Sequence, residues 1–247
     1  MQAYLDHAAT TPLRPESLAA MLPFLTEHFG NPSGSHAVAR RARVAVDEAR
    51  DEVASCLGCE PGEVVFSAGG TEADNLAVAG VHGSGRGTVA CSAVEHHAVG
   101  RTCDALGGTT VPVHGDGTVD LDALAGVLGP EVGLVSVMLV NNEVGTVQPL
   151  AQVAALVHEL APRALVHTDA VAAVGWLDVA ALTAVADLVS VSAHKFGGPK
   201  GVGALVVRGG VQLAPVLHGG TQERGRRPGT TDVAGVHGSG RGTVACS

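Results

Sequence analysis

Aromatic residues are scarce in this sequence: its 247 residues include one tryptophan, one tyrosine and four phenylalanines. Apolar residues still make up 46% of the chain, mostly alanine, valine and leucine, which is enough for a sizeable core. No apolar run is long enough to cross a bilayer, and the N-terminus lacks the basic-then-apolar pattern of a secretion signal. We therefore expect a cytoplasmic protein without a membrane partner, folded as one domain or a domain and a half.

Positive charge and cysteine are also in short supply. The 15 lysines and arginines are outnumbered by 24 aspartates and glutamates, and the net charge of −9 argues against nucleic acid as the main partner. Five cysteines, an odd number in a chain without a signal, argue against a disulfide framework. Cys56 and Cys59 form a lone Cys-x-x-Cys pair. Such a pair cannot complete a tetrahedral site by itself, so no metal is expected.

Apolar periodicity predicts alternating strands and helices along most of the chain. The expected strands are residues 64–66, 88–91, 109–113, 134–140, 165–168, 188–191 and 202–207, with a further short strand within 4–12. The expected helices are one beginning at Pro15 and residues 36–57, 71–81, 98–106, 121–128 and 150–160. This alternation predicts an α/β fold, a mostly parallel sheet with helices on both faces.

Ligands of such sheets bind beyond the carboxyl ends of the strands, so the loops that follow the strands decide the function. Lys195 lies in one of them, after the apolar run 186–191 and before a Gly/Pro turn. Partial desolvation at a strand end lowers the pKa of an amine and makes it nucleophilic enough for a Schiff base. A loop lysine without a role is the alternative interpretation of this residue alone.

Other strand-end loops carry groups that suit one cofactor. Gly70 and Thr71 open a helix whose free N–H groups bind phosphate, or they belong to an ordinary helix start. His96 either stacks on a flat ring and moves protons or merely caps a helix, and Asn142 offers an amide. Asp169 either holds a positive ring nitrogen or caps the next helix. A lysine together with such an acid is what a pyridoxal phosphate site requires.

The order and the residues of these motifs resemble those of the cysteine desulfurases, within the class V aminotransferase family of pyridoxal phosphate enzymes. The resemblance extends from the first residues to about Asp232. The matching stretches are residues 4–12, 30–33, 67–75, 94–96, 140–145, 167–170, 192–195, 218–220 and 223–230. The resemblance implies a fold-type-I large domain over residues 15–232, with residues 1–14 belonging to a small domain.

The resemblance also implies roles for individual residues. Lys195 carries the imine to the cofactor and moves the proton at the substrate α-carbon, while His96 stacks on the cofactor and Asp169 pairs with its ring nitrogen. Asn142 lies near the cofactor hydroxyl and the substrate carboxylate, and Asn31 is a second residue at the substrate. The residues implied to hold the phosphate are Gly70, Thr71, Ser192 and His194, with Thr230 reaching a phosphate in the partner subunit of a homodimer.

The reaction that the family performs is the third implication. L-cysteine gives up its sulfur as an enzyme-bound persulfide and leaves as L-alanine, and a sulfur-acceptor or scaffold protein takes the sulfur for iron–sulfur cluster or thio-cofactor assembly. Two alternatives remain open on the same loops. One is a non-catalytic remnant that only binds pyridoxal phosphate, and the other is a selenocysteine lyase or another class V relative.

Three departures from the family pattern affect these expectations. Ala172 stands where the family commonly has a glutamine that donates to the cofactor hydroxyl, which predicts weakened catalysis rather than a lost cofactor. The C-terminal small domain with its sulfur-accepting cysteine is expected to be missing. Residues 233–247 repeat residues 78–92 letter for letter, unlike a natural structural repeat, so we expect a misjoin near Asp232. Cys246 is then a copy of Cys91 and not a catalytic thiol.

Overall fold

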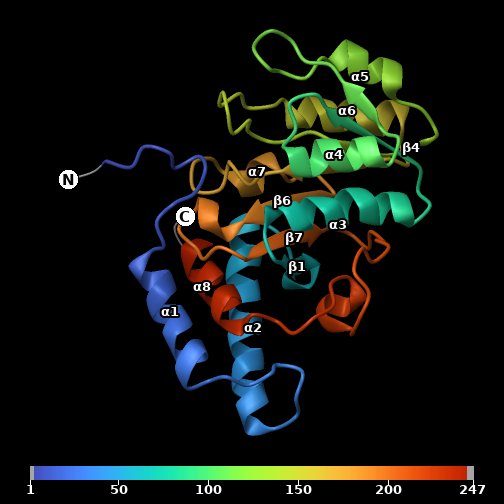
Figure 1. Ribbon diagram of the computed structural model, residues 1–247. Helices are drawn as coiled ribbons and strands as arrows, with labels where there is room; N and C mark the ends of the chain where they lie inside the picture. The colour runs from blue at the N-terminus through green and yellow to red at the C-terminus, as the bar shows by residue number, and fades with distance from the viewer. Residues whose placement is uncertain (1–2, 244–247) are drawn as a thin grey trace.

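A seven-stranded sheet forms the centre of the computed structural model, which describes residues 3–243 (Figure 1). The strand order is β1-β7-β6-β5-β4-β2-β3. β7 is antiparallel to both of its neighbours, and the pairs from β6 to β3 are parallel. The predicted mostly parallel sheet is therefore confirmed. The strands are β1 (Val64–Ser67), β2 (Thr88–Ser92), β3 (Thr109–Val111), β4 (Val132–Ser136), β5 (Leu165–Asp169), β6 (Leu188–Ser192) and β7 (Gly203–Val207).

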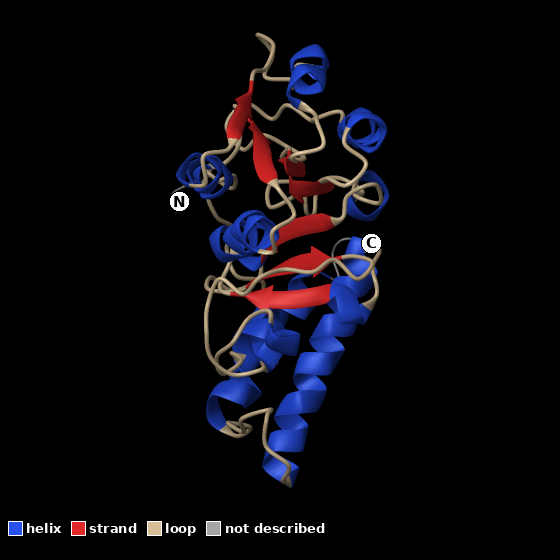
Figure 2. Cartoon of the chain, turned by 90° about the vertical axis from the view of Figure 1, so that its right-hand side faces the viewer, coloured by secondary structure: helices blue, strands red, loops and turns tan. Residues whose placement is uncertain are grey.

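Helices cover both faces of this sheet (Figure 2). Because side chains alternate along a strand, Val64 and Phe66 of β1 enter one apolar cluster and Val65 enters the other. The first cluster contains α2 (Ala37–Leu57), α5 (Leu121–Val127), α6 (Leu150–Leu160) and α7 (Val179–Leu182). The second cluster contains α3 (Gly70–Gly83) and α4 (His97–Ala105). No helix within residues 3–243 is both long and apolar enough to cross a membrane.

The N-terminal segment differs from the prediction. The strand expected within residues 4–12 is wrong, because this segment has no strand and lies against the loop after β6. Thr11 N–H donates to the carbonyl of His194 at 2.9 Å, and Arg14 N–H donates to the carbonyl of Gly197 at 2.9 Å. The backbone groups of the segment thus find partners in a loop instead of at a sheet edge. This docking brings residues 11–14 to the carboxyl end of β6.

The repeated stretch adopts two different structures. Residues 78–92 end α3, turn, and form β2, whereas residues 233–243 form the single helix α8 (Val233–Thr243). α8 packs against α1 (Pro15–Thr26) and α2, as Figure 1 shows. Within residues 233–243, the described part of the second copy, no residue belongs to the sheet. Residues 244–247, including Cys246, lie outside the described part of the chain.

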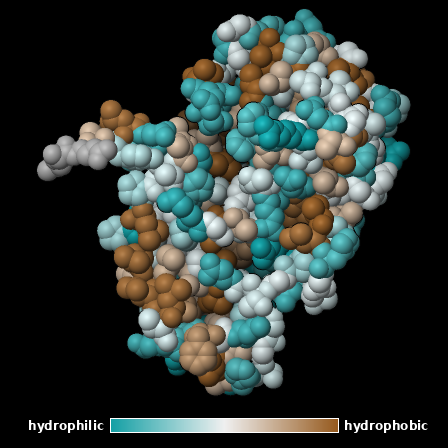
Figure 3. Space-filling model, in the orientation of Figure 1, coloured by the Kyte–Doolittle hydropathy of each residue, from teal (hydrophilic) through white to brown (hydrophobic). Residues whose placement is uncertain are grey.

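One face of α1 remains uncovered by the described residues. Leu18, Leu22 and Leu25 are 44%, 49% and 60% exposed, although their spacing predicts an apolar face that packs against other residues. Figure 3 shows hydrophobic surface gathered over this helix. α8 contacts the adjacent side of α1, because a Cβ built on Gly238 lies 2.5 Å from Cγ of Met21.

Candidate functional site

A cavity of about 250 Å³ lies at the carboxyl ends of the strands. The loops after β1, β2, β4, β5 and β6 all contribute to it, and Ala9 of the N-terminal segment closes part of it. Ala172, at the position of the expected glutamine, lines it as well. The structure thereby brings together these residues that the sequence singled out: Gly70, Thr71, His96, Asn142, Asp169, Ser192, His194 and Lys195.

Two of the expected site residues do not line this cavity. Asn31 is exposed, and its Oδ1 accepts a hydrogen bond from the N–H of Ser33 at 3.0 Å. Thr230 is also exposed, in the segment after η3 (Gln222–Gly225). The role expected for Thr230 concerns a second subunit, and it stays a prediction. The role expected for Asn31 has no support from the lining of this cavity.

Lys195 ends a short 3₁₀ turn, η2 (Ala193–Lys195), that directly follows β6. Its ammonium group donates a hydrogen bond to the carbonyl of Ala8, so the N-terminal segment fixes the direction of the side chain. Burial lowers the pKa of Lys195, and the carboxyl group of Asp169 opposes this shift. A lowered pKa increases the fraction of neutral amine, which is the nucleophilic form.

Asp169 is the last residue of β5 and is only 5% exposed. Its Oδ1 accepts a hydrogen bond from the N–H of Val171 at 2.9 Å, so it does not cap a following helix. Burial raises the pKa of Asp169, while the Val171 hydrogen bond, His96 and Lys195 oppose the rise. The carboxyl group therefore lies in the buried part of the cavity, with two basic side chains near it.

His96 caps the N-terminus of α4 and also reaches the cavity. Its Nδ1 accepts a hydrogen bond from the N–H of Ala98 at 3.1 Å. Because Nδ1 accepts, the neutral ring carries its hydrogen on Nε2. The capping role and the site role of His96 are thus compatible, since they use different atoms of the ring.

The start of α3 has the features of a helix N-terminus that can hold an anion. Gly69 has φ 138°, which favours glycine, and a Cβ on Gly70 would lie 2.9 Å from Cγ2 of Val171. The first N–H groups of a helix have no acceptor within the helix, and the helix dipole favours negative charge there. The buried hydroxyl residue Ser192 lies beside Gly70, with its Cβ 3.5 Å from the position of that Cβ.

Sequence reasoning missed four residues that line the cavity: Ala9, Asp74, Met138 and Val171. Asp74 follows Thr71 by three positions on α3, so both lie on one face of the helix, and this spacing was the available signal. Asp74 is 1% exposed, and one of its carboxyl oxygens lies within 4.8 Å of ring and carboxyl atoms of His96 and Asp169. The N–H of Met138 donates to Glu95 Oε1 at 2.5 Å, and burial raises the pKa of Glu95 to about 8.

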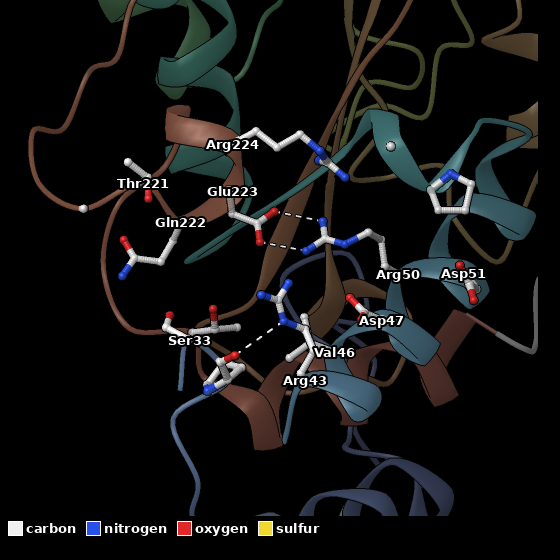
Figure 4. Close-up of a pocket in the computed structure, with 15 residues that line it drawn as sticks. Ser33, Arg43, Val46, Asp47, Arg50, Asp51, Thr221, Gln222, Glu223 and Arg224 are labelled. Carbon is white, nitrogen blue, oxygen red and sulfur yellow. Dashed lines mark hydrogen bonds and ion pairs between the residues drawn. The ribbon is translucent and has the colours of Figure 1, made fainter. Parts of the chain in front are cut away.

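A second, larger cavity of about 830 Å³ lies between α2 and the segment 220–224 (Figure 4). Arg50 binds Glu223 through two hydrogen bonds of 2.7 and 2.9 Å, and Glu223 also accepts the N–H of Phe66 at 2.9 Å. Glu223 and Arg224 have φ of 46° and 59°, which is unusual for residues other than glycine. The arginines and acids that line this cavity balance, so we interpret it as the anchor of the 221–225 segment.

The chain resembles known proteins over nearly its whole length. The family described as "Aminotransferase class-V" matches residues 3–243. A cysteine desulfurase of Cereibacter sphaeroides is 47% identical over 249 residues, covering 97% of this chain and 64% of that protein. "Cysteine desulfurase IscS" of Dictyoglomus turgidum is 45% identical over 248 residues, covering 97% of this chain and 62% of that protein. The chain thus spans less than two thirds of the length of these relatives.

Solved structures agree with the sequence matches. A structure described as "NIFS-LIKE PROTEIN" superposes with a TM-score of 0.95 at 38% identity, covering 99% of this chain and 70% of that chain. Another, described as "SspA in complex with cysteine", has a TM-score of 0.92 at 34% identity, covering 98% and 72%. These neighbours share both the sheet and the helices around it with the chain described above.

Proposed function

This chain belongs to the class V aminotransferase family, and from that membership we propose that it binds pyridoxal 5′-phosphate and removes sulfur from L-cysteine. The observation that carries the proposal is the cavity of about 250 Å³ that contains both Lys195 and Asp169. Two of its relatives, at 45% and 47% identity, are cysteine desulfurases. The proposed enzyme is therefore a cysteine desulfurase-type transferase.

The residues of the cavity fit this cofactor. Its volume of about 250 Å³ exceeds the ~150 Å³ that hold a benzene ring in a protein interior, so one substituted ring has room. The α3 N-terminus suits a phosphate group, since a side chain larger than glycine at Gly70 would meet Val171. Gly70, Thr71, Ser192 and His194 would hold the phosphate, and Asn142 would lie near the ring hydroxyl.

When bound, this cofactor supplies a ring that accepts the electron pair released at the substrate α-carbon. The chain supplies the proton transfers and the charges. Lys195, whose pKa is lowered by burial, is the amine that would hold the cofactor and accept the α-proton. Asp169 would offer a carboxylate to the positive ring nitrogen, and its burial would strengthen that interaction. His96 offers Nε2 for a further proton transfer, since its Nδ1 is engaged by Ala98.

L-cysteine is the proposed substrate, with Asn142 as the amide that receives its carboxylate. A structural neighbour, SspA, is described in complex with cysteine, which supports this substrate class. The cysteines within residues 3–243, Cys56, Cys59, Cys91 and Cys103, do not line the cavity. We propose that the chain acts as a homodimer and passes its sulfur to a thiol of an acceptor or scaffold protein.

A second candidate is a cofactor-binding protein that performs no turnover. Ala172 favours it, because this residue lines the cavity where a glutamine side chain would donate a hydrogen bond. The absence of a cavity-lining thiol among the described residues favours it too. Both candidates require the same cofactor, so only turnover distinguishes them.

The experiment loads the purified chain with pyridoxal 5′-phosphate, removes the excess, and adds L-cysteine with a thiol reductant. Retained cofactor together with sulfide and L-alanine in equal amounts supports the desulfurase. Retained cofactor without products supports the second candidate, and no retained cofactor contradicts both. Ala172→Gln is the matched variant, and we expect it to raise turnover because it restores a hydrogen-bond donor. L-selenocysteine in place of L-cysteine tests the selenocysteine lyase alternative.

A further inference from the structure

Asp74 is a buried acid that the proposed mechanism does not use. It comes from the second turn of α3, is 1% exposed, and lines the cavity next to Asp169. A carboxyl oxygen of Asp74 lies within 4.8 Å of one of Asp169. Two carboxylates so close in a buried site repel each other strongly, and one of them tends to keep its proton.

The nearest basic group does not neutralise Asp74. His167 Nε2 lies 3.7 Å from Asp74 Oδ1, but the imidazole is held between two hydroxyl groups. Ser136 Oγ is 2.8 Å from Nδ1, and Ser190 Oγ is 3.0 Å from Nε2. Complete burial lowers the pKa of His167 to about 3, so the ring is neutral at physiological pH. Asp74 Oδ1 has no hydrogen-bond partner among the described residues.

The surroundings of the two aspartates differ in kind. Asp169 accepts the N–H of Val171 at 2.9 Å and is close to His96 and Lys195, all of which favour its ionised form. For Asp74, the contact that favours the ionised form is the one with the Ser190 hydroxyl. The neighbouring acids Asp169 and Glu95 oppose its ionisation. The titratable groups around Asp74 are Asp169 and His167 of β5, Glu95 and His96 of the β2–α4 loop, and Lys195 after β6.

We propose that Asp74 holds a proton in the folded chain, so that the Asp74–Asp169 pair has a single negative charge and that charge lies on Asp169. Asp74 is then a positioning residue of the site. A neutral acid beside Asp169 leaves one carboxylate for the cofactor ring nitrogen, and this part of the inference rests on the proposed function. The proton also explains why Oδ1 of Asp74 is buried without a hydrogen-bond partner among the described residues. An undissociated acid carries no charge and therefore needs no cation beside it.

Infrared difference spectroscopy tests this assignment, because a protonated carboxyl group has a C=O band distinct from that of a carboxylate. We expect Asp74→Asn to remove one protonated-carboxyl band from the spectrum of the full chain near neutral pH, and Asp169→Asn to leave that band in place. Asp178→Asn, at an exposed helix cap, is the control and leaves it in place too. Loss of the band in Asp169→Asn, or its persistence in Asp74→Asn, overturns the proposal.

The pH dependence of unfolding gives a second measurement that does not need the cofactor. A carboxyl group whose pKa is raised on folding binds a proton that the unfolded chain has released, so stability falls as pH rises. Between about pH 5 and 7 we expect the unfolding free energy of the wild type to fall more steeply with pH than that of Asp74→Asn. The difference in slope corresponds to one bound proton. Parallel curves overturn the proposal.

Addition of pyridoxal 5′-phosphate completes the test. We expect the Asp74 band to persist in the loaded chain, because Asp169 supplies the charge for the ring nitrogen. Loss of the band on loading overturns the assignment of that charge to Asp169. A chain that fails to bind the cofactor contradicts the proposed function instead, and the measurements without cofactor still decide whether Asp74 is protonated.

Discussion

At the residue scale, burial sets the charge of the acids around the cavity. Glu95 shows this most simply, because burial and a neighbouring acid are the main causes of its pKa shift. Its Oε1 accepts the N–H of Met138, while Oε2 is buried without a partner among the described residues. Burial raises its pKa from 4.5 to about 8, and the neighbouring Asp169 adds to the rise. The carboxyl group therefore enters the folded state as a neutral acid at physiological pH.

This predicts a pH-dependent contribution of Glu95 to stability. The folded-state pKa of about 8 lies above the unfolded value of 4.5, so stability is greatest below 4.5 and declines as pH rises toward 8. The slope is about 1.4 kcal/mol per pH unit at most. Glu95→Gln keeps an acceptor for Met138 but cannot ionise, so we expect a flatter dependence of the unfolding free energy between about pH 5 and 8.

Urea denaturation across that pH range measures the effect. Glu159→Gln, an exposed position on α6, is the matched control and should retain the wild-type slope. Equal slopes for Glu95→Gln and the wild type would show that Glu95 is ionised in the folded chain.

At the scale of the element, identical residues form a turn in one place and a helix in another. Gly85 and Gly240 occupy equivalent positions in the repeat, yet their backbones differ. Gly85 has φ 77° and open space around its Cβ position. Gly240 is helical, and its Cβ would lie 3.1 Å from Cα of Ala49. Glycine is thus required for its backbone conformation in one copy and for close packing in the other.

Alanine substitutions at these two glycines should act by different mechanisms. We expect Gly85→Ala to destabilise by about 1 kcal/mol through left-handed strain, and Gly85→Asn to be better tolerated. We expect Gly240→Ala to destabilise by about 1–3 kcal/mol through overpacking, although alanine favours helices, and Gly240→Asn to be worse. Thermal or urea denaturation of the four variants compares them. A stabilised Gly240→Ala would contradict the close packing of α8 on α2.

The pair between Arg50 and Glu223 anchors a second element, the strained segment 221–225. Both side chains are largely buried, at 11% and 7% exposure. Arg50→Ala leaves a buried carboxylate without its partner, and we expect a loss of about 3–5 kcal/mol in unfolding free energy. Arg241→Ala breaks a pair with Glu52 that is 47% and 22% exposed, and should lose at most about 1 kcal/mol. Equal effects of the two variants in urea denaturation would contradict this anchoring role.

Apolar periodicity and turn residues were sufficient to predict most of these elements. Gly58, for example, ends α2 with φ 62°, as its position after an apolar helix predicts. Long-range partners could not be predicted in this way. The pattern of the N-terminal segment predicts a strand, but the N–H groups of Thr11 and Arg14 donate to residues 194–197, which are distant in the sequence. The sequence predicts only that Asp74 is a polar residue of a helix. Its burial follows from the packing of α3 on the sheet.

At the scale of the whole molecule, the site depends on the order of the strands. β5 and β6 are paired in parallel, with Asp169 opposite Ser190, so the residues after both strands meet at one edge of the sheet. The N-terminal segment then closes this edge, through Ala8 on Lys195 and Thr10 on His194. Segments far apart in the sequence thus build one cavity, and removal of any of them should disturb it.

The uncovered face of α1 predicts self-association. Leu22 and Leu25 are about half exposed on this helix, over which Figure 3 shows hydrophobic surface. We expect the double variant Leu22→Gln, Leu25→Gln to scatter less light at high concentration than the wild type. Leu160→Gln, on α6 and 41% exposed, is the control for loss of a single exposed leucine. Equal scattering by the double variant and the wild type would show that this face does not drive association.

The most direct test of the account is the identity of the amine that holds the cofactor. The chain has only two lysines, Lys195 and the exposed Lys200, so the second is a control supplied by the sequence itself. The full chain is loaded with pyridoxal 5′-phosphate, reduced with borohydride, digested, and mapped by mass spectrometry. We expect a reduced cofactor on the Lys195 peptide, lost in Lys195→Ala and kept in Lys200→Ala. A label on Lys200, or an unlabelled Lys195 in loaded protein, would contradict it.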